Sequence, residues 1–196
     1  MDDEALVSRA RAGDLSAAER LFSRHQNGAY TAALRLLAVP ADAEDVAQDV
    51  LVRAFTHMAE LGEGASFGAW LRRIAVNLSL NVLRRRGLLQ FEPLEGGGEK
   101  GAPGDARDFA DERAMSPEDS VINIALRDEL DLLVRRLPAE QRVAVVLRDI
   151  YGYDVAEVAE LQRCGLSAAK MRIARGREQL RRLVIEAGIR LGASAT

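Results

Sequence analysis

The sequence has very few residues of the kinds that build metal centres, disulfides or catalytic clusters. Its 196 residues include one cysteine, Cys164, and two histidines, His25 and His57. A single cysteine cannot form an internal disulfide, and no grouping of Cys and His has the spacing of a metal site. We therefore expect a reducing, cytoplasmic compartment, no metal or other cofactor, and no catalytic residue. The chain is not expected to be an enzyme.

Long apolar runs are also missing. No stretch approaches the roughly 20 apolar residues that span a bilayer. The acidic N-terminus lacks the apolar segment of a signal peptide, so neither membrane insertion nor secretion is expected. Aromatic residues make up only 5% of the chain, whereas Ala, Leu, Val and Arg are abundant. These residues favour helix over strand, and we predict an all-α fold.

The net charge of −3 is unevenly distributed. Residues 1–87 have net charge 0, residues 88–120 have −6, and residues 121–196 have +3. The acidic middle stretch contains the triplet Gly96–Gly98 and three prolines, so it cannot bury enough apolar surface to offset the cost of ordering it. We predict a flexible acidic linker at 88–120. It would join two helical domains, 1–87 and 121–187, and residues 188–196 would form a tail.

Apolar residues at helical spacing predict four helices in the N-terminal domain. They span about 3–12, 14–37, 41–60 and 66–86. Ser66 is the expected N-cap of the fourth helix, and Gly87 is its expected end. On the third helix, the apolar positions assigned to the inner face are Val46, Val50, Leu51, Ala54 and Phe55.

Four more helices are predicted in the C-terminal domain, at about 121–136, 138–149, 154–162 and 166–187. Asp154 and Glu157 have the spacing of a capping box. The short third helix and the long fourth helix are separated by Arg163-Cys164-Gly165, a helix-turn-helix pattern. The stripe expected to face inward on the last helix is Leu166, Ala169, Ile173, Gly176, Leu180 and Val184. The opposite face holds Met171, Arg175, Glu178 and Arg182, flanked by Lys170, Arg172 and Arg177.

The last helix is strongly basic. Residues 163–182 contain seven basic side chains and one acidic one. Such a helix can enter the major groove, with its first residues at base edges and flanking cations at phosphates. The alternative is a solvated, arginine-rich surface on an ordinary helical bundle. The capped partner helix and the turn favour DNA binding.

Three strings of the sequence carry a family resemblance. They are DAEDVAQDVLVRAF at 42–55, SFGAWLRRIAVN at 66–77 and LPAEQRVAVVLRDIYGYDVAEVAEL at 137–161. In this order and spacing they resemble the extracytoplasmic-function (ECF) sigma factors of the sigma-70 family, the promoter-recognition subunits of bacterial RNA polymerase. The resemblance covers nearly the whole chain. It implies a sigma-two-like domain over 1–87 and a sigma-four-like helix-turn-helix domain over 121–187.

This resemblance implies a function and a set of partners. The protein would direct core RNA polymerase to specific promoters and assist promoter melting at transcription initiation. Its partners would be the clamp helices and flap of core polymerase, promoter DNA, and an anti-sigma factor. The residues that would bind core polymerase are Asp42, Glu44, Asp45, Gln48 and Asp49. For Asp42, a helix-capping charge is the alternative role.

The resemblance also assigns residues to the minus-ten promoter element. These are Leu61, Arg72, Arg73, Ile74, Asn77, Arg84 and Arg85. Leu61, Ile74 and Asn77 would hold an unstacked base, and the arginines, with Arg86, would bind phosphates. Compensation of the helix dipole is the alternative role for the run Arg84–Arg86. Phe67 and Trp70 are interpreted as core residues that shape the site. The loop 61–64 lacks the family's frequent aromatic and basic residues.

The residues assigned to the minus-thirty-five element are Arg148, Arg163, Lys170, Met171, Arg172, Ala174 and Arg175. The family's usual run after the turn is Val-Gly-Thr-Val-Lys-like, but here only Ala168 and Ala169 precede Lys170. Either the turn is 163–165 or it slips by two residues; the first is adopted because it keeps Leu166 and Ile173 inward. Met171 and Ala174 can then make only apolar contacts, and Arg175 would read most of the sequence.

Two other functions remain open. A dimeric helix-turn-helix regulator would need a dimer surface and a palindromic site, but not the helix at 42–51. A sigma-like mimic would bind an anti-sigma factor without DNA, which the alanine-rich recognition helix allows. The cations at 170, 172 and 175, together with the N-terminal strings, favour the sigma factor. Cys164 is expected to be buried in the turn.

Overall fold

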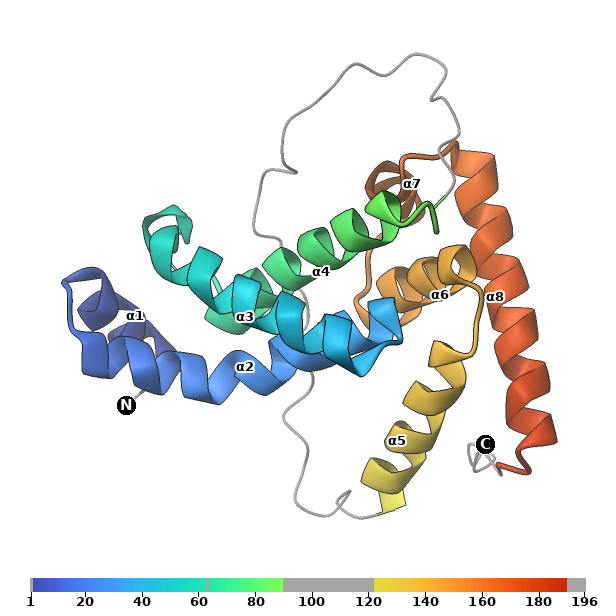
Figure 1. The fold of residues 1–196 in the computed structure, drawn as a ribbon, viewed down its shortest axis with the longest axis horizontal. Coiled ribbons are helices and arrows are strands. Elements are labelled where there is room, and N and C mark those ends of the chain that lie inside the picture. The colour runs from blue at the N-terminus through green and yellow to red at the C-terminus, as the bar shows by residue number, and fades with distance from the viewer. Residues whose placement is uncertain (1, 63, 90–121, 190–196) are drawn as a thin grey trace.

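The computed structural model describes residues 2–62, 64–89 and 122–189, with the side chains of 122–125 left out, and this part of the chain is helical without strands. The N-terminal helices are α1 (Asp3–Arg11), α2 (Leu15–Leu37), α3 (Pro40–Thr56), the 3-10 helix η1 (Met58–Glu60) and α4 (Phe67–Arg85). The C-terminal ones are α5 (Ile122–Arg135), α6 (Ala139–Val145), η3 (Val146–Ile150), α7 (Val155–Gln162) and α8 (Leu166–Glu186) (Figure 1). The predicted all-α fold with two helical domains is confirmed. The predicted linker, apart from Leu88 and Leu89, lies outside the described residues.

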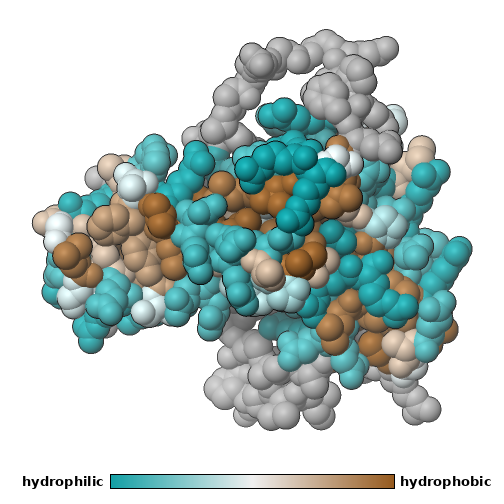
Figure 2. Space-filling model, in the orientation of Figure 1, coloured by the Kyte–Doolittle hydropathy of each residue, from teal (hydrophilic) through white to brown (hydrophobic). Residues whose placement is uncertain are grey.

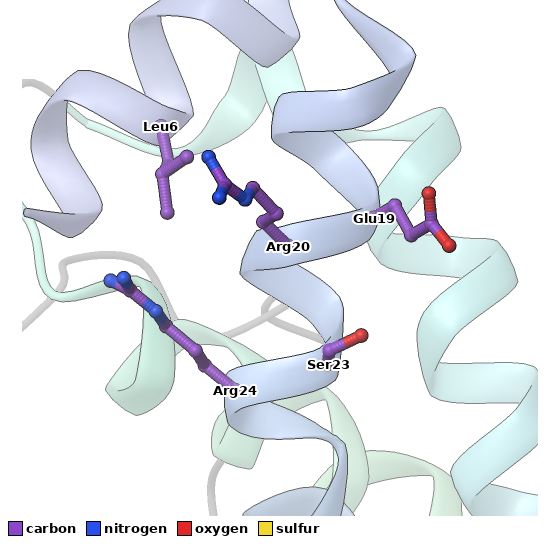
Figure 3. A pocket seen from close by; sticks show the side chains of 5 residues that line it. All are labelled: Leu6, Glu19, Arg20, Ser23 and Arg24. Carbon is purple, nitrogen blue, oxygen red and sulfur yellow. The ribbon is translucent and has the colours of Figure 1, made fainter. Parts of the chain in front are cut away.

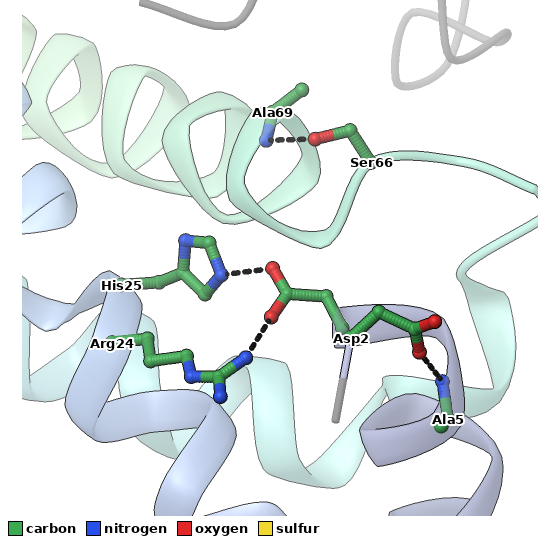
Figure 4. Close-up of polar contacts among 7 residues, drawn as sticks. Asp2, Ala5, Arg24, His25, Ser66 and Ala69 are labelled. Carbon is green, nitrogen blue, oxygen red and sulfur yellow. Dashed lines mark hydrogen bonds and ion pairs between the residues drawn. The ribbon is translucent and has the colours of Figure 1, made fainter. Parts of the chain in front are cut away.

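Side-chain caps fix where several helices begin. Asp2, Asp14 and Ser66 each accept a hydrogen bond from the backbone N–H three residues later, which satisfies a donor that the helix itself leaves unpaired. Figure 4 shows two of these caps, on α1 and α4. Asp154 and Glu157 form the predicted capping box at the start of α7. The starts of α4 and α7 are therefore confirmed at the residues that the sequence indicated.

One predicted helix has a different form. The sequence predicts a regular helix over 138–149, but α6 ends at Val145 and continues as the π-helical turn η3. The wider turn lets the amides of Tyr151 and Tyr153 reach back to the carbonyls of Val146 and Leu147, each at 3.0 Å. Both tyrosine side chains are buried as a result.

Each domain has a buried interior lined by the inner faces of its helices. In the N-terminal domain α2 packs against α1, α3 and α4, and Leu21, Leu36 and Leu71 are almost completely buried. In the C-terminal domain α8 crosses α6 and α7. Gly176 allows the close crossing with α6, because a Cβ there would lie 2.6 Å from Val145 Cγ2 and 3.0 Å from the carbonyl oxygen of Gln141.

The two domains are in direct contact. The C-terminal half of α2 packs against α5 and α6, and α4 packs against α7. Buried Arg142 of α6 donates from Nε to the carbonyl of Leu36 in α2, at 2.9 Å. Its Nη1 donates to the carbonyl of Leu137, at 2.8 Å, and to that of Arg135, the last residue of α5, at 3.4 Å. One guanidinium thus caps the C-terminal ends of α2 and α5, where helix dipoles favour a cation. An ion pair between Arg35 of α2 and Asp131 of α5, with Nε and Oδ1 2.8 Å apart, is a second contact between the domains.

Candidate nucleic-acid interface

Helices α7 and α8 form a helix-turn-helix. Helix α7 ends at Gln162, α8 begins at Leu166, and Arg163 takes the left-handed conformation, φ 52°, that ends α7. Cys164 is completely buried in the turn, as expected. The turn is therefore at 163–165, the register adopted from the sequence. Leu166 does not face inward, however, because it is 49% exposed.

Helix α8 presents a short outward face. Lys170, Met171, Ala174 and Arg175 are exposed, while Ala169, Ile173 and Gly176 on the other side are buried. A small apolar residue and a methionine therefore lie between two cations on the surface. The arrangement matches what a recognition helix needs, which is an accessible face on a rigid, well-packed element.

The structure contradicts the placement of Arg172 on an exposed flank of α8. Its side chain is nearly buried, and the guanidinium donates to Gln162 Oε1, at 3.2 Å, and Glu140 Oε1, at 2.9 Å. The acceptors come from α7 and α6, so Arg172 of α8 connects these three helices. In this structure it is a packing residue, and its guanidinium is directed into the domain.

Two further arginines assigned to the minus-thirty-five element differ in their surroundings. Arg148 donates to the carbonyl of Tyr153, at 2.9 Å, and so braces the segment between η3 and α7. Arg163 is exposed at the turn. It lies near Arg84 of α4, and the pKa of Arg84 is lowered first by burial and then by the charge of Arg163. Of the two, Arg163 is better placed to meet a phosphate.

Helix α4 carries all the residues assigned to the minus-ten element except Leu61, and part of this helix faces the C-terminal domain. The Arg72 guanidinium lies 5.6 Å from the centre of the Tyr151 ring, and Arg84 donates to the carbonyl of Leu161, at 2.6 Å. Burial raises the pKa of Tyr153 to about 12, although the charges of Arg73 and Arg72 oppose this rise. Three arginines of α4, Arg72, Arg73 and Arg84, thus lie close to the residues that follow η3 or to α7.

The remaining minus-ten residues are partly accessible, with one exception. Arg73, Ile74 and Asn77 are half-buried, and Arg85 is exposed. Leu61 is only 3% exposed and belongs to the core, so in this structure its side chain does not form a wall for a base. The reason is that η1 turns the chain inward after α3. Phe67 is buried and Trp70 packs beside it at 5.8 Å, as their interpretation as core residues requires.

The outer face of α3 combines acidic and apolar residues. Glu44, Asp45, Gln48 and Asp49 are exposed. Asp42 differs, because it is paired with Arg86 at the end of α4, and the hydrogen bond from Arg86 lowers the pKa of the Asp42 carboxyl. Its side chain does not cap α3.

Sequence reasoning missed two residues of the α3 face. Val52 is 66% exposed, and Phe55, which was expected to face the core, is 52% exposed. They follow Gln48 at helical spacings of four and seven and therefore lie on one stripe with it. Figure 2 shows apolar surface among hydrophilic surface at the end of the molecule where α1, α2 and the end of α3 lie. The sequence contained one indication of this apolar surface. Val52 is apolar, but its helical position does not fall on the predicted inner stripe of α3.

Outside the candidate faces, the described residues form a notable hollow. A hollow of about 340 Å³ between α1 and α2 is lined by Leu6, Glu19, Arg20, Ser23 and Arg24, and the two arginines extend along one side of it (Figure 3). None of these residues belongs to the candidate faces. Within the described ranges, no cluster of three or more His, Cys, Asp or Glu residues could hold a metal ion. No helix among the described residues is long and apolar enough to cross a membrane.

Comparison with protein families gives two matches. Residues 21–88 match Sigma-70 region 2, and residues 127–180 match Sigma-70 region 4. The first match covers most of α2 and all of α3 and α4, and the second covers most of α5, all of α6 and α7 and the first two-thirds of α8. The two matched regions therefore coincide with the two helical domains.

Individual relatives match over nearly the whole chain. It is 32% identical over 182 residues to the ECF RNA polymerase sigma factor SigM of Mycobacterium tuberculosis (strain ATCC 25618 / H37Rv), covering 93% of this chain and 84% of the relative. It is 28% identical over 176 residues to the ECF RNA polymerase sigma factor SigW of Bacillus subtilis (strain 168), covering 90% and 93%. Among solved structures, CnrH in complex with the cytosolic domain of CnrY has a TM-score of 0.51 and 23% identity, over 94% of this chain and 97% of that one. This last likeness supports the fold alone.

Proposed function

The chain belongs to the ECF RNA polymerase sigma factors and directs core RNA polymerase to promoters, and we propose that three separate faces share this task. The α3 face binds core polymerase, the α4 face binds the minus-ten element, and the α8 face binds the minus-thirty-five element. The observation that supports this proposal most directly is the exposed, cationic face of α8 on a closely packed helix-turn-helix. The protein acts without a catalytic group of its own, in the cytoplasm where polymerase works.

Recognition of the minus-thirty-five element rests on four residues of α8 and one of the turn. Arg175 supplies the base-specific contact, because a guanidinium can bind both acceptors of a guanine edge. Met171 and Ala174 contact apolar groups such as a thymine methyl. Lys170 and Arg163 bind phosphates. Arg172 has no part in this contact, because its donors are used inside the domain.

Core polymerase is bound by the outer stripe of α3. Gln48 and Asp49 supply polar and charged contacts, and Val52 and Phe55 supply the apolar area that gives a stable interface its core. Asp42 supports the surface indirectly by fixing Arg86 and with it the end of α4.

Capture of the minus-ten element falls to α4. Ile74 and Asn77 provide one apolar and one polar group near an unstacked base, and Arg73 and Arg85 bind the phosphates beside it. Arg72 and Arg84 join them once they leave Tyr151 and the Leu161 carbonyl. The three faces together would position polymerase and hold the strands apart.

Run-off transcription with core RNA polymerase on a library of promoter fragments tests this proposal. We expect specific initiation that depends on the protein. The double variant Gln48→Ala, Asp49→Ala should lose initiation and core binding. Arg175→Ala should weaken promoter discrimination by about 1–3 kcal/mol. Arg181→Ala is the matched control on the same helix, since Arg181 is exposed and pairs only locally, with Glu178.

An anti-sigma factor is the remaining proposed partner. The main competing function is that of a sigma-like mimic, which would bind an anti-sigma factor without binding DNA. The inward position of Arg172 leaves α8 with fewer cations for DNA, which favours a sigma-like mimic. Binding to an anti-sigma factor without core binding or initiation would establish the mimic. Salt-sensitive binding to a palindrome in the absence of polymerase would instead indicate a dimeric regulator.

A further inference from the structure

Helix α1 is connected to the segment that follows α3 through one arginine. Arg11, in the last turn of α1, donates from Nε to the carbonyl of Met58, at 3.2 Å, and from Nη2 to the carbonyl of Leu61. These acceptors lie 47 and 50 residues further along the chain. One planar guanidinium thus binds both ends of the turn η1, and its two bonds fix the direction of that turn.

Among the described residues between η1 and α4, one backbone hydrogen bond lies within the segment, from the Ala65 amide to the Gly62 carbonyl at 3.3 Å. Gly62 and Gly64 have no side chain to pack, and Gly64 has a positive φ of 71°, so this backbone is costly to order. Met58 and Leu61 are anchored by burial, at 6% and 3% exposure. Apolar burial fixes where these residues lie but is not directional. The hydrogen bonds of Arg11 are directional, and they therefore orient the backbone carbonyls of these two residues.

The other end of α1 is also held firmly. Asp3 accepts from Arg24 Nη1, at 3.0 Å, and lies 2.5 Å from His25 Nε2, both on α2. The His25 ring in turn packs edge-on against Phe67, the first residue of α4, at 5.4 Å between ring centres. Figure 4 shows Arg24 and His25 of α2 near the Ser66 cap that begins α4. Helix α1 is therefore braced against α2 near its start and against the η1 segment at its end.

We propose that Arg11 is a positioning residue for minus-ten recognition. It orients the backbone of residues 58–61, and this backbone sets the path of the chain into α4, the helix whose Ile74 and Asn77 are proposed to contact the base. The inference rests on the proposed function of α4 and adds α1, which carries none of the residues assigned to DNA. Arg11 acts through the segment it holds and does not itself contact the promoter.

The test compares the full-length protein with Arg11→Gln and Arg11→Lys. Arg9→Gln is the matched control, because Arg9 lies on the same helix but binds Asp14 at the start of α2. The first measurement is amide hydrogen exchange of the peptide spanning 57–66. We expect about tenfold faster exchange in Arg11→Gln, an intermediate effect in Arg11→Lys, and little change in the control.

The second measurement is promoter discrimination by the holoenzyme. Initiation is compared on a fragment selected with the unaltered protein and on versions with one base changed in the minus-ten or minus-thirty-five element. Arg11→Gln should reduce minus-ten discrimination about fivefold to tenfold and leave minus-thirty-five discrimination unchanged. Because discrimination is a ratio of rates, a smaller folded fraction does not alter it.

Unchanged exchange at 57–66 in Arg11→Gln would overturn the proposal. Faster exchange with intact minus-ten discrimination would also overturn it, because Arg11 would then be only a structural brace. A failure of the proposed function looks different: the unaltered protein and Arg9→Gln would then show no promoter-specific initiation at all.

Discussion

Replacing Arg142 by methionine removes the charged group that caps one helix of each domain. Methionine keeps most of the apolar stem but none of the donors. The carbonyls of Leu36 and Leu137 then lose their partner in a buried place, at about 1–3 kcal/mol each. Burial also lowers the pKa of Arg142, and relief of that desolvation returns part of the loss. We expect a net loss of about 3 kcal/mol in the free energy of unfolding.

For a chain of this length, a loss of about 3 kcal/mol lowers the melting temperature by roughly 6–12 °C. Two signals should be followed during thermal unfolding. Circular dichroism reports all helices, and the fluorescence of Trp70, the only tryptophan, reports the N-terminal domain. Both transitions should shift, because Arg142 is in one domain and Leu36 is in the other. Arg136→Met is the matched control, since Arg136 is exposed on the same stretch.

A Trp70 transition that stays in place while the C-terminal domain melts earlier would refute the reasoning. It would mean that the bond to Leu36 does not stabilise the protein in solution. A shift no larger than that of Arg136→Met would refute it as well.

The remaining predictions concern single contacts. Gly176→Ala should lower the free energy of unfolding by about 1–3 kcal/mol in urea, because the new methyl group collides with α6; Gly28→Ala, where a Cβ meets nothing within 4 Å, should instead stabilise by about 0.5–1 kcal/mol. Asp154→Ala should cost about 1 kcal/mol by removing the capping box of α7, and an unchanged urea midpoint would contradict this. The pKa of Asp3 is lowered, since the bonds from α2 outweigh the opposing effect of burial. The stabilisation that ionised Asp3 gives to the folded state is therefore present above about pH 5, and it disappears as pH falls through the folded pKa of Asp3. The difference in melting temperature between the protein and Asp3→Asn should follow that course.

Local signals were enough to predict most helix boundaries. Ser66 and Asp154 begin helices because their side chains bind the first free amides, an interaction contained within four residues. The turn at 163–165 was likewise fixed by neighbouring residues. Family resemblance then predicted the faces, and Lys170 and Arg175 lie exposed, as the predicted recognition helix requires.

The residues that were misplaced depend on distant partners. Arg172 is buried because Glu140 and Gln162 supply acceptors from two other helices. Leu61 is buried because η1 turns the chain inward and places its side chain in the core. Periodicity describes one helix at a time, so it cannot show that a long cationic side chain has a partner in the interior. The contact between Arg142 and Leu36 spans 106 residues and has no local signal at all.

Under the proposed role of α4, the contacts that Arg72 and Arg84 make with the C-terminal domain link the arrangement of the domains to promoter affinity. In the proposed function, Arg84 leaves the Leu161 carbonyl before it binds a DNA phosphate. The two states therefore form a coupled equilibrium, and the measured promoter affinity is the intrinsic affinity multiplied by the fraction of molecules in which these contacts are broken. A substitution in the C-terminal domain that weakens them would raise that fraction. It would tighten promoter binding without adding a single contact to DNA.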